Sequence, residues 1–164
     1  MSESVFEYEA KPKGARIMMS TLSPADPRPR VSVTAVKLLR AARHGLAEAD
    51  AETSPGTRYI CAHLAALRAA AAIVAARDPG AGGRRRGPRS VWELLPQAEP
   101  ALGEWAAFFA ASASKRAAVE AGLLRAASGR EADDLLRDAT TFVGVAERAL
   151  GVESQAELPL RPAS

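Results

Sequence analysis

Two residues near the start of an alanine- and leucine-rich segment have the types and spacing that chemistry would need. Arg58 precedes His63 by five positions in the run Thr57-Arg58-Tyr59-Ile60-Cys61-Ala62-His63. A histidine can move the proton of a ribose hydroxyl and an arginine can stabilise a phosphorane, so the pair could cleave RNA without a metal. In a regular helix the two side chains point about 140° apart, so they converge only if Arg58 lies in the turn before the helix.

His63 also has a structural interpretation. It lies beside an apolar seam, where a partly buried histidine bonded to a neighbouring helix is expected. With 18 arginines and two histidines in 164 residues, one such spacing arises by chance about half of the time. Arg58 would then be a solvated first-turn residue or one paired with a carboxylate. The sequence leaves both interpretations open.

Arg116 is a second candidate, because helical spacing places it on the same face as Phe109 and Val119. A charge on such a face needs a partner, and Glu120, one turn further on, is the nearest candidate. Arg116 could therefore form a structural salt bridge or reach solvent. Alternatively, with Lys115 beside it, it could belong to an anion or partner site at the end of the bundle.

A basic segment follows the glycine-rich residues 78–83 and could bind the phosphates of RNA or of a nucleotide. Residues 31–150 hold 16 Lys/Arg against 13 Asp/Glu, and four of those arginines belong to this segment. The segment has no interleaved aromatic residue for base stacking, so a solvated linker is the alternative. The residues predicted to contact nucleic acid are Arg84, Arg85, Arg86, Arg89, Lys115 and Arg116.

The composition limits what else the chain could be. Cys61 is the only cysteine and there are two histidines, so we expect no disulfide, no metal and no cofactor. Neither a run of about 18 uninterrupted apolar residues nor a basic, apolar leader is present, so we expect a cytoplasmic protein without a membrane span.

The apolar periodicity predicts helices throughout the central part of the chain. We expect helices over residues 31–50 and 57–77, a short helix after a capping box at Ser90, a helix from Pro100 to about Gly122, and one from a capping box at Ser128 to Gly151. The second helix is predicted to pack through a seam of Ile60, Leu64, Leu67, Ala71 and Val74. The helix after Pro100 is predicted to pack through Leu102, Trp105, Phe109, Val119 and Leu123, with Phe108 at the edge of that face.

These elements predict an all-α protein: an up-and-down bundle of four main helices plus a short helix over residues 30–151. The proline-rich residues 1–29 are expected to be disordered, and residues 152–164 to form a flexible tail. Met18 or Met19, rather than Met1, could be the start of translation.

The order of several segments resembles a small HEPN-domain family of actinobacteria, the Streptomyces-type HEPN family. The segments are Arg58-Tyr59, residues 63–68, the basic linker, residues 90–95, residues 104–110, Lys115-Arg116 and residues 131–136. The resemblance covers roughly residues 31–150. The order of these segments and the two tryptophans within them make the resemblance specific.

This resemblance implies a helical bundle, often paired into dimers, in a superfamily that contains RNA-cleaving toxins as well as inactive proteins that bind partners or nucleotides. In the RNA-cleaving members an Arg-x4-6-His motif typically lies near the start of the last helix. In this chain the corresponding residues, 130–137, contain no histidine.

The favoured prediction is therefore a non-catalytic HEPN protein that binds a protein or nucleic-acid partner. A dimer surface with Trp92, Trp105 and Phe108, together with the basic segment, would make the contact. The alternatives are a metal-independent endoribonuclease using Arg58 and His63, and an RNA- or nucleotide-binding module that uses the basic segment.

Overall fold

The computed structural model describes residues 31–78 and 89–152, and all regular structure within these two ranges is helical. The helices are α2 (Val33–Ala51), α3 (Pro55–Arg77), α4 (Val91–Ala98), α5 (Gly103–Glu120) and α6 (Gly129–Leu150). Two short 3-10 turns, η1 (Pro100–Leu102) and η2 (Leu124–Ala126), flank α5. The predictions for residues 1–29, for Arg84, Arg85 and Arg86, and for the tail from residue 153 lie outside the described residues.

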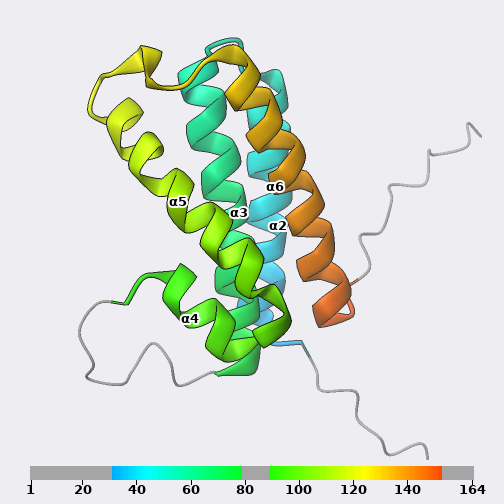
Figure 1. Cartoon of the computed structure of the whole chain (residues 1–164). Helices are drawn as coiled ribbons and strands as arrows, with labels where there is room; N and C mark the ends of the chain where they lie inside the picture. Colours follow the sequence, from blue (N-terminus) through cyan, green and yellow to red (C-terminus); the bar gives the residue numbers. More distant parts are fainter. Residues whose placement is uncertain (1–30, 79–88, 153–164) are drawn as a thin grey trace, which may run out of the picture. The chain divides into compact units, whose positions relative to one another are not determined.

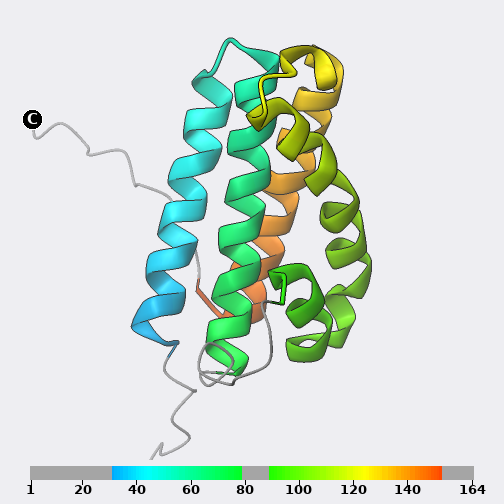
Figure 2. The same ribbon diagram turned by 90° about the vertical axis from the view of Figure 1, so that its left-hand side faces the viewer.

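The four long helices run alternately up and down. Figure 1 shows α2, α3 and α6 side by side, with α5 tilted across them and the short α4 beside the first half of α5. The view from the side places α3 between α2 and α5 (Figure 2). This arrangement confirms the predicted bundle of four main helices plus a short one.

Serine side chains cap the starts of four helices; the caps at Ser90 and Ser128 were predicted, whereas those at Ser32 and Ser54 were not, and α3 begins at Pro55, two residues before the predicted start. The Oγ atoms of Ser32 and Ser54 accept hydrogen bonds from the backbone amides of Ala35 and Thr57, at 3.1 and 3.4 Å. Ser90 and Ser128 each form a capping box with the glutamate three residues further on. Each box satisfies amide groups that a helix start leaves without partners, which explains why both boundaries could be predicted.

α5 ends near the predicted glycine, but Leu123 beyond it does not lie on the apolar face. The helix stops at Glu120, and Gly122 adopts a φ of +96°, a conformation that side-chain-bearing residues rarely adopt. Leu123 therefore leaves the apolar face and is 64% exposed, so its predicted place in the core is wrong. The prediction extended a helical period past the glycine that breaks it.

α3 is the central helix, since α2, α4, α5 and α6 all pack against it. The predicted seam is confirmed in part: Val74 is buried and Ile60 and Leu67 pack partly buried against the core, whereas Leu64 and Ala71 are only partly buried. The buried side chains are mostly small: Ala62, Ala65, Ala66, Ala69, Ala70 and Ala72, with Tyr59, His63, Ile73 and Val74. A helix enclosed on most sides buries most of its circumference, and alanines let its neighbours approach closely.

By length and composition α3 is also apolar enough to cross a membrane, a test that the core helix of a bundle passes too. In this structure its buried faces are covered by the four helices around it.

Aromatic rings join α4, α5 and α6 at the lower end of the bundle. Trp92 stacks on Phe109 at a ring distance of 5.2 Å, and Phe109 lies 5.3 Å from Phe142. Trp105 also stacks on Phe109, at a ring distance of 5.9 Å. Trp92 is thus 6% exposed and belongs to the core rather than to an association face, whereas Phe108 is 43% exposed.

Candidate functional site

His63 lies in the middle of the bundle with no exposed surface. Its Nε2 atom is 3.1 Å from the carbonyl oxygen of Phe109 on α5, and its ring meets those of Trp92 and Phe109 edge-on. A carbonyl oxygen only accepts, so Nε2 carries the proton and Nδ1 is left as an acceptor. Arg116 Nη1 lies 3.4 Å from Nδ1 and donates to it.

This surrounding keeps the imidazole neutral. Burial is the main reason that the pKa of His63 is lowered from 6.5, with Arg116 acting in the same direction. The Phe109 carbonyl and Glu120 oppose the shift in pKa without cancelling it. His63 is therefore bonded to a neighbouring helix, as its structural interpretation predicted, and is fully rather than partly buried.

Arg116 connects this interior to the surface. Its Nε atom is 3.6 Å from Glu120 Oε2, so Glu120 is its ion-pair partner, as the sequence predicted. That distance exceeds a good hydrogen bond, and Nε is buried without a hydrogen-bond partner. The structure thus brings His63 together with Arg116, two residues that the sequence assigned to different sites.

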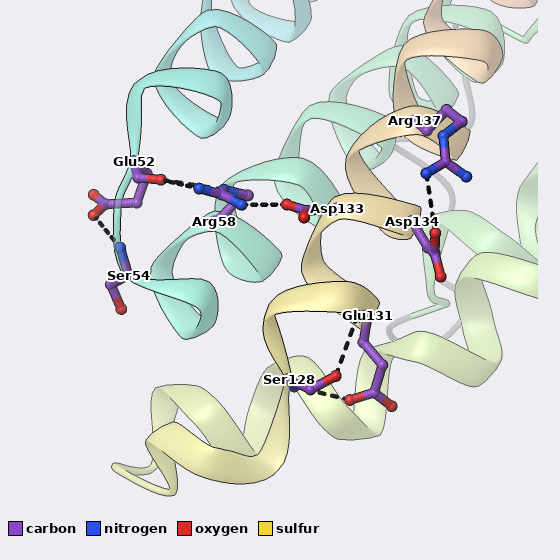
Figure 3. A network of polar contacts seen from close by, with 8 residues as sticks. All are labelled: Glu52, Ser54, Arg58, Ser128, Glu131, Asp133, Asp134 and Arg137. Atoms are coloured by element: carbon purple, nitrogen blue, oxygen red, sulfur yellow. Dashed lines mark hydrogen bonds and ion pairs between the residues drawn. The ribbon is translucent and has the colours of Figure 1, made fainter.

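Arg58 makes its contacts at the opposite side of α3. Its Nε and Nη2 atoms donate to the carbonyl oxygen of Glu52, at 3.1 and 2.7 Å, and Nη1 pairs with the carboxylate of Asp133 on α6. Figure 3 shows this arginine between the α2–α3 turn and the first part of α6. These contacts explain why a cation occurs in the first turn of a helix, where the helix dipole opposes it. No hydrogen bond or ion pair joins Arg58 to His63, and catalysis by this pair stays a prediction.

A groove of about 440 Å³ lies between α5 and α6. Its lining consists of Tyr59, Phe108, Ala111, Ser112, Lys115, Glu131, Asp134, Leu135 and Asp138. Tyr59 comes from α3, which both α5 and α6 contact, so α3 forms the floor. The tyrosine is 5% exposed and its hydroxyl donates to the Ser112 carbonyl at 3.5 Å, the outer limit of a hydrogen bond.

An ion pair closes one end of the groove. Lys115 Nζ pairs with Glu131, whose second carboxylate oxygen accepts from the backbone amide of Ser128 at 2.9 Å. The bond to Lys115, followed by the bonds to Ser128, lowers the pKa of Glu131 from 4.5 to about 2. Figure 3 shows Glu131 beside Ser128 at the start of α6, with Asp134 and then Arg137 further along the helix. Glu131 therefore stays charged at physiological pH and holds Lys115 in place.

The residues predicted to contact nucleic acid are only partly gathered by the structure. Lys115 and Arg116 are adjacent on α5, but one is paired with Glu131 and the other is turned toward His63. Arg89 is exposed just before α4. Among the residues described, no group of His, Cys, Asp and Glu could hold a metal ion.

Several groove residues were missed by the sequence analysis. Tyr59, Asp134 and Asp138 were not selected, because helical periodicity does not say which helices stand apart from each other. The spacing of Asp134 and Asp138, four residues apart on one helix, was the available signal.

The fold and this site define an all-α bundle with a buried histidine and an open groove at its side. Residues 49–147 match the SAV_6107-like HEPN family, which is more than half of the chain. The protein belongs to this small, actinobacterial-type HEPN family. Neither the comparison with curated proteins nor that with solved structures gave a match.

Proposed function

We propose that this HEPN domain is a non-catalytic module that binds a partner protein. The observation that carries the proposal is the state of His63, which is fully buried with both ring nitrogens engaged. A general acid or base must reach the proton that it transfers, and an imidazole enclosed by Trp92, Phe109 and Arg116 offers no path to a ribose hydroxyl.

The contacts of Arg58 support the same proposal. Its guanidinium is held by Glu52 and Asp133, and its side chain is 22% exposed. An arginine that stabilises a phosphorane must direct its donors at the phosphate, and these donors are used inside the protein.

A cleavage assay on labelled RNA tests the proposal. The purified full chain is compared with Arg58→Gln and His63→Gln, and with His44→Gln, which removes the exposed histidine. Circular dichroism first establishes that each variant is folded. We expect no cleavage that depends on His63 or Arg58.

The proposal is overturned by cleavage by the wild type and by His44→Gln that is lost in folded His63→Gln and Arg58→Gln. That result would establish the endoribonuclease. Cleavage that is equal in all four proteins shows that neither Arg58 nor His63 takes part, and it overturns the non-catalytic role if the activity stays with the chain through a further purification step.

The charge balance favours a protein over RNA as the partner. Residues 31–78 and 89–152 contain 13 Lys/Arg and 13 Asp/Glu, so this part of the chain has no net charge. Several of its cations are paired with carboxylates: Arg43 with Glu147, Arg58 with Asp133, Arg77 with Glu99, and Lys115 with Glu131. RNA affinity arises mainly from an excess of cations near phosphates, and in these ranges the equal number of carboxylates opposes it.

A further inference from the structure

We propose that the groove between α5 and α6 binds an arginine side chain of a partner protein. This inference rests on the proposed binding function and assigns it a surface. The groove combines an apolar lining, an exposed aromatic ring and an unpaired carboxylate. Each of these recognises a different part of an arginine.

The groove exists because α5 and α6 both pack on α3 while their own backbones stay apart, although the rings of Trp105 and Phe109 reach Phe142 of α6. Figure 1 shows α5 leaning away from α6 toward the upper end of the bundle. The pair of Lys115 and Glu131 closes one end. Phe108 precedes Lys115 by seven residues, and Asp138 follows Glu131 by seven, so in these antiparallel helices both lie about two turns along from the closed end.

Carboxylates dominate the charge of the groove. Glu131 is already paired with Lys115, and Asp134 accepts from Arg137 at 3.1 Å, an arginine whose side chain is 71% exposed. The side chain of Asp138 makes no hydrogen bond or ion pair within the described ranges. A guest therefore meets three carboxylates and one lysine, and a cation fits this balance where a phosphate would be repelled.

The apolar parts suit the stem and the plane of an arginine. Ala111 and Leu135 line the groove and can pack against its methylene groups. Phe108 is 43% exposed and lies edge-on to Trp105 and Phe109, which hold its ring before a guest arrives. A guanidinium stacks on such a ring and pairs with a carboxylate through two donors, which a lysine ammonium does less well.

Fluorescence anisotropy of a labelled peptide tests the inference. The probe is a short peptide in which arginine and leucine alternate, titrated with the full-length chain. The comparison peptide has glutamate in place of every arginine. We expect the arginine peptide to bind and the glutamate peptide not to bind.

Matched variants locate the binding. Asp138→Asn and Phe108→Ala are expected to weaken it about three- to tenfold each. Asp50→Asn and Leu123→Ala, which remove an exposed carboxylate and an exposed leucine away from the groove, are expected to change it less than about twofold. Thermal unfolding of each variant separates lost binding from lost structure.

Three results overturn the inference: absence of binding, equal binding of the glutamate peptide, or equal affinity in Asp138→Asn and Asp50→Asn. None of them bears on the cleavage assay, so the groove can fail while the non-catalytic function stands.

Discussion

At the scale of single residues, the interior around His63 depends on a neutral imidazole. Nδ1 must keep its lone pair to accept from Arg116, and a second proton would place two cations 3.4 Å apart in the core. Burial already lowers the pKa of His63 for the same reason.

This predicts a loss of stability in acid. The unfolded chain binds the proton with the ordinary pKa of 6.5, while the pKa of folded His63 is lower, so protons favour unfolding below about pH 6.5. The free energy of unfolding should fall from there until the folded pKa is passed. Urea unfolding between pH 7.5 and about 4.5 measures it.

The two histidine variants separate this effect from other acid effects. The loss should be smaller in His63→Gln, whose amide cannot be protonated in this range, and should persist in His44→Gln. Identical pH dependence in wild type and His63→Gln would contradict the prediction.

The contacts of His63 also show where residue-scale prediction ends. The pair of Arg116 and Glu120 follows from a four-residue spacing on one helix, and it is present. The contact of Arg116 with His63 joins residues 53 positions apart. Local spacing carries no information on such a pair, because it depends on how α3 and α5 are rotated.

At the scale of elements, the start of α3 packs tightly against the end of α5. A Cβ atom at Gly56 would lie 2.9 Å from Val119 Cγ1 and 3.4 Å from the Leu124 carbonyl oxygen. Val119 is 3% exposed and branched, so it has little room to move.

We therefore expect Gly56→Ala to destabilise the protein by about 1–3 kcal/mol through overpacking. Gly103 at the start of α5 has no atom within 4 Å of such a Cβ, so Gly103→Ala should be neutral or stabilising by up to about 1 kcal/mol. Thermal unfolding of the two variants measures the difference. Equal changes in stability in the two variants would mean that α3 and α5 can move apart to make room for the added methyl group.

The aromatic rings give α4, α5 and α6 a shared support. Phe109 contacts the rings of Trp92, Trp105 and Phe142 and has no exposed surface. We expect Phe109→Ala to cost about 3–5 kcal/mol, because the cavity that it leaves is enclosed.

Phe108→Ala is the matched control, and it should cost markedly less because this ring is 43% exposed. Chemical denaturation of both variants tests the comparison. A loss of similar size in Phe108→Ala would mean that the edge of α5 supports the bundle as much as its core does.

At the scale of the whole molecule, the helices could be predicted better than their packing. Capping serines, Pro100 and the glycines after α5 and α6 mark local boundaries, so the order and approximate ends of the helices followed from sequence. The burial of α3 did not, since Leu64 and Leu67 are the larger apolar residues and yet the alanines are the ones enclosed. Which face is enclosed depends on how many helices surround it. The groove could not be predicted from the sequence for the same reason, because it is a space between two helices.

The charge of the whole chain is also unevenly distributed. The described ranges have equal numbers of Lys/Arg and Asp/Glu, while the chain carries a formal charge of +3. We expect any salt-dependent affinity for RNA to fall when Arg84, Arg85, Arg86 and Arg89 are replaced by alanine, and to persist in the variant Lys37→Ala with Arg40→Ala. Filter binding over a range of salt concentrations measures this. Equal losses in both variants would assign the affinity to the bundle.

Glu131 gives the protein an internal reporter. One carboxylate caps α6 through the Ser128 amide and also closes the groove through Lys115. A cationic guest that competes with Lys115 for Glu131 would draw it from the cap, and the Ser128 amide would then exchange its hydrogen with solvent faster. Hydrogen exchange at the Ser128 amide can thus register an occupant of the groove without a label, and a substitution of Glu131 that opens the closed end also removes the cap of α6.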